Sequence, residues 1–389
     1  MQSHPMVGIE WVISLGLMMI VIWLRMKGWS PSSMWGMGLG GCVTIISHLI
    51  SPTQPITFEP ESFMYMLLPP IVLHSGLMFD IRSSKRTLSL SLCYAWVGTL
   101  TTALWVGYAL WSVDAVESLA LSFWIGSVVA STDAVSTIEL TKTKNIDDNV
   151  KTILNNESIF NDAVAVMLVH TCSRWYENSI SMESREMIEI VAVTIGLCVL
   201  SICIGVLLAF ISKYWSNNSC AVLILSLLSY AICESIGSSG IISIFFFGIT
   251  FKTMNRETIV NKFSNITRVM SEFSELYVYV SMGAVVMGMK ADYMKYGWTV
   301  FCACIVSRVF YVFVIGYFFK LGGETLSIRD LNVIISGGIR GAVSMALAVS
   351  SPKDLYSLFL TITAMEVMLS MIFTMLMLRC LVKKDNLPI

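Results

Sequence analysis

The sequence reads SVVASTDAVSTIEL at 127–140 and NNESIFNDAVAVMLVH at 155–170. Both segments are rich in apolar residues, as membrane-spanning helices are, yet they contain Asp133, Glu157 and Asp162. A carboxylate near the centre of a bilayer costs about 2.5–3.5 kcal/mol on insertion scales, so it faces the protein interior, a partner or water. These segments therefore predict a bundle of membrane helices with a polar site in its interior.

The composition of the whole chain also indicates a membrane protein. Of the 389 residues, 56% are hydrophobic and 13% are charged, against roughly 25% charged in a soluble domain. The net charge of −1 gives no reason to expect a nucleic-acid partner, so the expected surroundings are a lipid bilayer. The ten cysteines lie mostly in apolar runs without metal-ligand spacing, which favours packing residues over disulfides or a metal site.

Thirteen apolar runs are long enough, or nearly so, to cross a bilayer, which predicts an all-α polytopic membrane protein. The ninth run is short and bounded by glycines. The runs fall at about 9–25, 33–50, 62–80, 87–111, 117–140, 149–173, 187–212, 219–235, 239–251, 269–288, 296–319, 328–350 and 355–380.

The distribution of lysine and arginine predicts the topology. If the loop after the first helix is cytoplasmic, 18 of these residues lie on the cytoplasmic side and 5 on the other. Basic residues concentrate in cytoplasmic loops. We therefore expect a multi-pass protein of the plasma membrane or an endomembrane, with an outside or lumenal N-terminus and a cytoplasmic C-terminus. Because the sequence ends in KKDNLPI, we expect neither a soluble regulatory tail nor tail-binding regulators.

Thirteen helices divide into two repeats of six and one connecting helix. The expected single transport domain, 1–389, then comprises a first repeat at about 9–174, a connecting helix at about 187–213 and a second repeat at about 219–382. Because six is even and the connector is one helix, the repeats are inverted relative to each other.

The fifth and twelfth helices are counterparts in this arrangement, and both contain residues that interrupt a helix. The fifth contains STDAVST at 131–137, and the twelfth contains SGGIRGAVSM at 336–345. Glycine, serine, threonine and aspartate weaken a helix. Crossed, broken helices in corresponding positions point to an ion site near the membrane midplane, between the repeats.

The sixth helix carries a polar stripe that faces this site. Glu157 and Asn161 are four residues apart, as are Ser158 and Asp162, so both pairs lie on one side of the helix. Ser158 and Asn161 serve equally well as polar packing between helices. For Asp162 a packing role is unfavourable, because an apolar residue would be far less costly there.

Together with the broken fifth helix, this stripe predicts a small cage of oxygen ligands. The cage consists of Asp162, Asp133, Ser158 and the backbone near Thr132. Oxygen ligands suit hard cations such as Na⁺. Since a buried carboxylate also holds protons more tightly than an exposed one, a proton and a cation are expected to compete for Asp162.

Two arginines within helices require partners. For Arg340, in the break of the twelfth helix, we expect a structural ion pair with Glu157 between the two repeats. For Arg308, in the eleventh helix, we expect Glu275 in the tenth.

These motifs resemble the sodium/proton exchangers of the monovalent cation:proton antiporter group, in particular the membrane domain of the eukaryotic type. The resemblance covers nearly the whole chain, and ESxxND with GGxRGA is its most specific part. In two places the sequence departs from the family pattern: Ala134 replaces a proline after Thr-Asp, and His74 replaces an aspartate. The matching blocks are FMYMLLPPIVLHSG, STDAV, ESIFNDAVAVML, FSELYVYVSMG, SRVFYVF and GGIRGAVSMAL.

The resemblance implies an inverted-repeat homodimer with an elevator-like motion that exchanges one Na⁺ (or Li⁺) for one H⁺. Asp162 matches the aspartate that carries the ions, and Asn161 matches its neighbour, which is associated with electroneutral exchange. Asp133, Thr132 and Ser158 match the other cation-site positions. No cofactor is implied beyond the transported ions.

Other functions are compatible with some of these features. A K⁺/H⁺ exchanger of the same fold has the same ligand types. A cation channel uses the same carboxylates but carries net current. An intramembrane aspartyl protease would pair Asp133 with Asp162. The Asn161–Asp162 pair, Arg340 and the lack of a GxGD motif argue against this enzyme, so we expect a transporter and not an enzyme.

Overall fold

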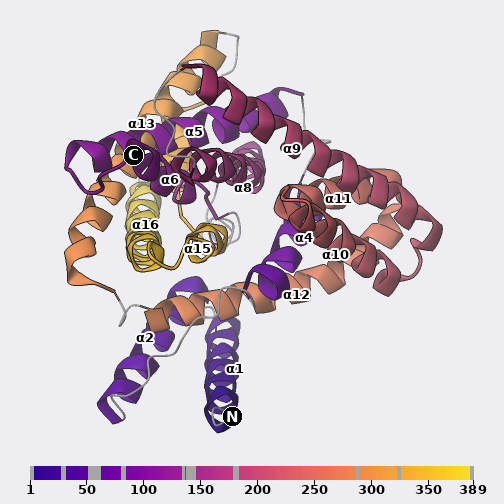
Figure 1. Cartoon of the computed structure of the whole chain (residues 1–389), viewed down its shortest axis with the longest axis horizontal. Coiled ribbons are helices and arrows are strands. Elements are labelled where there is room, and N and C mark those ends of the chain that lie inside the picture. The colour runs from indigo at the N-terminus through magenta and orange to yellow at the C-terminus, as the bar shows by residue number, and fades with distance from the viewer. Residues whose placement is uncertain are drawn as a thin grey trace.

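The computed structural model describes residues 4–27, 32–50, 63–79, 85–133, 136, 146–177, 184–285, 289–321 and 326–385. These residues are almost entirely helical (Figure 1). The helices are α1 (His4–Met26), α2 (Ser32–Ile50), the π-helix η1 (Phe63–Leu67), α4 (Leu68–Met78), α5 (Lys85–Ser112), α6 (Leu119–Val128), α8 (Asp148–Glu177), α9 (Ser184–Ser212), the 3₁₀-helix η2 (Lys213–Trp215), α10 (Ser219–Ser235), α11 (Gly240–Met254), α12 (Glu257–Val285), α13 (Ala291–Leu321), α14 (Ile328–Ser336), α15 (Ala342–Val349) and α16 (Tyr356–Asp385).

The predicted all-helical polytopic fold is confirmed. The part of the chain that the structure describes has fourteen α-helices, one more than the thirteen predicted, because the break at 337–341 divides the twelfth into α14 and α15. The short ninth helix is present as α11. α12 and α13 begin earlier than predicted, at Glu257 and Ala291, because their first turns are helical but polar.

The fifth helix is broken where the sequence predicts it. α6 ends at Val128, and the chain has no helical hydrogen-bonding pattern from Ser131 to Asp133. Residues 134–135 and 137–145, among them Ala134, lie outside the described residues.

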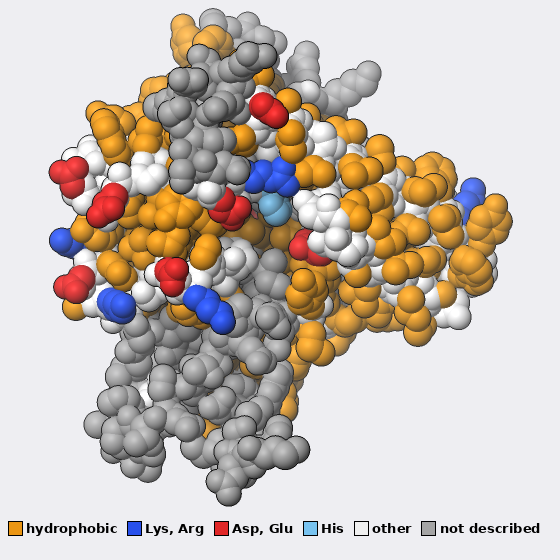
Figure 2. Space-filling view, viewed as in Figure 1, with side chains coloured by type: hydrophobic (Ala, Val, Ile, Leu, Met, Phe, Trp, Pro, Cys, Tyr) orange, Lys and Arg blue, Asp and Glu red, His pale blue; other side chains and the backbone are white. Residues whose placement is uncertain are grey.

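The surface of the described helices suits a lipid environment. Four of them are both long and apolar enough to cross a membrane: Thr87–Ser112, Ile188–Trp215, Ala291–Lys320 and Tyr356–Met377. Figure 2 shows hydrophobic side chains spread over the part of the molecule formed by α9, α10 and α11. On α9 the exposed hydrophobic residues include Ile188, Val191, Val193, Ile195, Val199, Leu200, Leu207 and Phe210.

The helices pack into two groups, which Figure 1 shows side by side. We call α5, α6, α8, α13, α14, α15 and α16 the core group, because they pack mainly on one another. We call α1, α2, α4, α9, α10, α11 and α12 the panel group. The two groups meet through few elements, chiefly α8 with α9 and α11, and α12 with α15 and α16.

The helix pairings have the symmetry that two six-helix repeats predict, with α9 as the connector. In these repeats α10, α11 and α12 are the counterparts of α1, α2 and α4. α2 packs on α12, and correspondingly α11 packs on α4. Likewise, α1 packs on α2, and α10 packs on α11. In the core group, α5 packs on α8 as α13 packs on α16. Two further contacts, α4 with α12 and α5 with α13, join counterpart helices to each other.

Glycines bring the paired panel helices into backbone contact. A Cβ atom on Gly40 of α2 would lie 2.1 Å from the carbonyl oxygen of Val280 of α12, and one on Gly283 would lie 2.1 Å from that of Met37. The counterpart pair uses the same device, since a Cβ on Gly76 of α4 would lie 2.4 Å from the carbonyl oxygen of Phe245 of α11. Small residues at such crossings let membrane helices approach closely.

Substituting Gly40 with alanine is expected to separate α2 from α12. Overpacking a tight contact typically costs about 1–3 kcal/mol, so Gly40→Ala should lower the melting temperature of the detergent-purified protein. Gly38→Ala on the same helix is the matched control, because nothing lies within 4 Å of a Cβ placed there. Equal melting temperatures for the two variants would contradict the close crossing.

Candidate functional site

The two broken helices cross and complete each other's hydrogen bonding. The backbone N–H of Asp133 donates to the carbonyl of Ile339 at 2.7 Å, and Ser344 Oγ donates to the carbonyl of Ser131 at 3.1 Å. Gly341 permits this approach, since a Cβ there would lie 2.4 Å from Asp133 Cβ. Each break therefore supplies partners for polar backbone groups that the other leaves unbonded.

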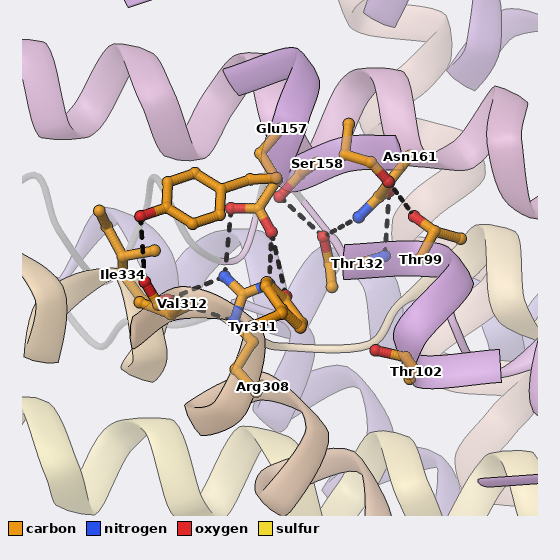
Figure 3. A network of polar contacts seen from close by, with 12 residues as sticks. Thr99, Thr102, Thr132, Glu157, Ser158, Asn161, Arg308, Tyr311, Val312 and Ile334 are labelled. Atoms are coloured by element: carbon orange, nitrogen blue, oxygen red, sulfur yellow. Dashed lines mark hydrogen bonds and ion pairs between the residues drawn. The ribbon is translucent and has the colours of Figure 1, made fainter. Parts of the chain in front are cut away.

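The polar stripe of α8 holds the break of the fifth helix (Figure 3). Asn161 Oδ1 accepts from the backbone N–H of Thr132 at 3.2 Å, and Asn161 Nδ2 donates to Thr132 Oγ1 at 2.5 Å. Thr132 Oγ1 in turn donates to Ser158 Oγ at 3.0 Å. All three side chains are buried, so this network fixes the shape of the break.

Asp162 lies beside this network and is more accessible than its neighbours. Ser131 Oγ donates a hydrogen bond to Asp162 Oδ1. The Asp162 side chain is half-buried, whereas Ser131, Ser158 and Asn161 are buried. Asp162 is thus fixed on one oxygen and still partly open.

Asp133 is held from the other group of helices. Its Oδ2 atom accepts a hydrogen bond from the hydroxyl of Tyr279 in α12 at 2.5 Å, and the backbone N–H of Ser136 lies 3.4 Å from the same oxygen. Asp133 also lies close enough to Asp162 to add to the negative potential there. The five residues predicted for the ion site therefore come together, and the structure adds Ser131 and Tyr279 to them.

The predicted ion pairs of the two arginines are wrong. Glu157 pairs with Arg308, not with Arg340: Arg308 Nη1 contacts Glu157 Oε1, and Nη2 lies 3.3 Å from Oε2 (Figure 3). The same guanidinium donates to the carbonyl of Ile334 at 2.8 Å, where α14 nears its break. Glu275, the partner expected for Arg308, instead accepts from Ser271 in its own helix at 2.8 Å.

Arg340 does not pair with Glu157 but donates hydrogen bonds to the break of the fifth helix. Its Nη1 atom donates to the carbonyl of Ala130 at 2.5 Å and lies 3.3 Å from that of Ser131. Its carboxylate partner is Glu366 of α16, with Arg340 Nε 3.8 Å from Glu366 Oε1. The carbonyls exposed by a break attract the guanidinium, and the sequence gives no direct sign of which carbonyls these are.

A small cavity lies between the two arginines. Its volume is about 20 Å³, and Arg308, Arg340 and Glu366 are among its lining residues. Within the described part of the chain, Arg340 Nε and Glu366 Oε2 are buried without a hydrogen-bond partner. The cavity has room for about one water molecule, which these two atoms would bind.

Double-mutant cycles distinguish the two possible partners of Glu157. Removing one member of a buried pair costs about 3–5 kcal/mol, so Glu157→Gln and Arg308→Gln should each lower the melting temperature strongly. Combined, they should cost clearly less than their sum, because each single variant leaves one unpaired buried charge and the double variant leaves none. The same cycle with Arg340→Gln should be additive. Coupling of Glu157 to Arg340 and not to Arg308 would contradict the observed pairing.

Comparisons with known proteins show the family of the chain. The family model described as "Sodium/hydrogen exchanger, transmembrane" matches residues 12–384. The chain belongs to the sodium/hydrogen exchanger family. One relative is sodium/hydrogen exchanger 2 of Oryctolagus cuniculus, which is 25% identical over 84% of this chain and 43% of the relative. Another is sodium/hydrogen exchanger 1 of Dictyostelium discoideum, which is 26% identical over 78% of this chain and 46% of the relative.

The fold is also that of a solved member of the antiporter group. The sodium proton antiporter MjNhaP1 from Methanocaldococcus jannaschii aligns with a TM-score of 0.79 at 21% identity, covering 96% of this chain and 100% of that one. In contrast, the chain spans about half the length of the first curated relatives that it matches. The part of this chain that the family model matches is described as transmembrane.

One departure from the family pattern has a defined place in the structure. His74 in α4 is half-buried, and its Nδ1 atom lies 3.2 Å from Thr267 Oγ1 of α12. Both helices belong to the panel group, so His74 joins two panel helices and makes no hydrogen bond to the ion-site residues described above.

Proposed function

We propose that this protein is a secondary active antiporter that exchanges Na⁺, or Li⁺, for H⁺ at Asp162. One observation carries this proposal. Within the described residues, Arg308 pairs with Glu157 and Arg340 with Glu366, while no salt bridge joins Asp162 to a basic residue. A half-buried carboxylate without a basic partner requires another positive charge, and a proton or a metal cation supplies one.

The surrounding oxygens favour a hard cation as the alternative to the proton. Hydroxyl groups of Ser131, Thr132 and Ser158 lie on one side of the site, and Asp133 adds a second carboxylate. These are the ligand types that Na⁺ and Li⁺ prefer. A proton at Asp162 and a cation bound to it neutralise the same charge, so they exclude each other.

This competition explains why transport would be an exchange and not a leak. Moving an uncompensated carboxylate through a low-dielectric region is unfavourable, whereas a protonated or cation-bound carboxylate carries no such penalty. The ion site therefore moves across the membrane only when Asp162 holds a proton or a cation. One Na⁺ inward for one H⁺ outward moves no net charge, so we infer electroneutral 1:1 exchange.

The architecture also supports a movement of one helix group against the other. Asp162, Asn161 and both helix breaks belong to the core group, and this group meets the panel group through few elements. We infer an elevator-like displacement of the core group along the panel group, in a homodimer. The topology with a cytoplasmic C-terminus, the choice of membrane and the preference for Na⁺ over K⁺ belong to the same proposal.

Replacing the titrating carboxylate should abolish exchange. Asp162→Asn in proteoliposomes is expected to show no Na⁺-dependent proton flux, because an amide takes up no proton at neutral pH and supplies no negative charge to hold Na⁺. Asp148→Asn in the first turn of the same helix is the control, since the Asp148 side chain is 95% exposed and its variant should transport normally. Flux at the wild-type rate in Asp162→Asn would contradict the site assignment.

The stoichiometry predicts how the two gradients balance. A tenfold Na⁺ gradient is worth about 1.4 kcal/mol, which equals one pH unit. Vesicles with this gradient should therefore settle near a one-unit pH difference, at every imposed membrane voltage. A voltage-dependent balance, or steady cation current on a solid-supported membrane, would instead indicate unequal stoichiometry or a channel. Repeating the assay with K⁺ tests the K⁺/H⁺ alternative.

A further inference from the structure

A tyrosine of the panel group donates a hydrogen bond to a carboxylate oxygen of the candidate ion site. The Tyr279 hydroxyl donates to Asp133 Oδ2 at 2.5 Å and lies 3.3 Å from Ser136 Oγ. Tyr279 is 4% exposed, so its hydroxyl is sequestered from solvent at this position. A cation that bridges Asp133 and Asp162 through this oxygen has to displace the hydroxyl.

The backbone of Tyr279 is rigidly tied to the panel group. A Cβ atom on Gly36 of α2 would lie 3.1 Å from Tyr279 Cβ. One turn further along, Gly40 and Gly283 hold the backbones of α2 and α12 in direct contact. Because α12 is fixed in this way, Tyr279 cannot follow Asp133 if the core group moves. Their hydrogen bond therefore links the two groups only in this arrangement.

We propose that Tyr279 is a positioning residue that sets the cation affinity by competing with the transported cation for Asp133 Oδ2. This inference rests on the function proposed above. A cation that binds both carboxylates displaces the tyrosine hydroxyl, and part of its binding free energy is spent on breaking that bond. A proton that binds Asp162 leaves the Tyr279–Asp133 bond intact. The hydroxyl thus weakens cation binding without weakening proton binding.

The same competition connects ion binding to the contact between the helix groups. The Tyr279–Asp133 bond joins α12 of the panel group to the break of the fifth helix in the core group. When the cation takes Asp133 Oδ2, this bond is lost, and the cation-loaded core group is released from α12. Tyr279 is therefore expected to affect cation binding more than proton binding.

The test is to remove only the hydroxyl, with Tyr279→Phe, and to measure cation binding to the purified protein. Binding is followed as the rise in melting temperature with Na⁺ or Li⁺ concentration at constant ionic strength. The midpoint concentration should fall about tenfold, which corresponds to the loss of one competing hydrogen bond to a charged group. The KM for Na⁺ in proteoliposomes should fall in parallel, with a smaller change in kcat.

Tyr94→Phe is the matched control. Tyr94 is also buried, but its hydroxyl donates to the backbone carbonyl of Val312 at 3.4 Å and, among the residues that the structure describes, to no carboxylate. Its cation midpoint should equal that of the wild type. An unchanged or raised midpoint in Tyr279→Phe would overturn the competition. If the wild type and Asp162→Asn responded identically to cations, the proposed function itself would fail, whatever the result for Tyr279.

Discussion

The structure depends on one constraint: polar backbone groups released by a helix break cannot find water in a bilayer core and must be satisfied by protein. The two breaks solve this together. Asp133 N–H bonds to Ile339 of the opposite break, and Ser344 bonds back to Ser131. Arg340 adds a charge to this crossing by donating to the Ala130 carbonyl. Without the crossing, neither break would be stable in the membrane.

Around the crossing, the buried arginines are paired, whereas the carboxylate of Asp162 has no basic partner among the described residues. The buried arginines Arg308 and Arg340 are each matched by a glutamate, Arg308 by Glu157 and Arg340 by Glu366, and both pairs also support a backbone break. Asp162 lies next to this balanced frame and is held by a neutral hydroxyl. A fixed frame with one carboxylate that needs a mobile positive charge is what an ion-exchange site requires.

The sequence predicted the helices, both breaks and the proximity of the polar residues around Asp162, because these follow from apolar length, helix-weakening residues and i, i+4 spacing. The ion pairs predicted from the sequence are wrong. Which carboxylate a long arginine side chain reaches depends on how α13 and α16 pack, and residue spacing does not show this packing. Glu366, the partner of Arg340 in the structure, is 1% exposed. Tyr279 lies 146 residues from Asp133 in the sequence, so sequence spacing does not indicate that its hydroxyl contacts Asp133.

The most direct measurement of the central claim, that one carboxylate serves either ion, is proton release on cation binding. Na⁺ or Li⁺ is added to purified protein in weakly buffered detergent solution containing a pH indicator. The account predicts that cation binding releases protons in the wild type, up to one per protomer, and none in Asp162→Asn. Saturable cation binding by the wild type without proton release would contradict it.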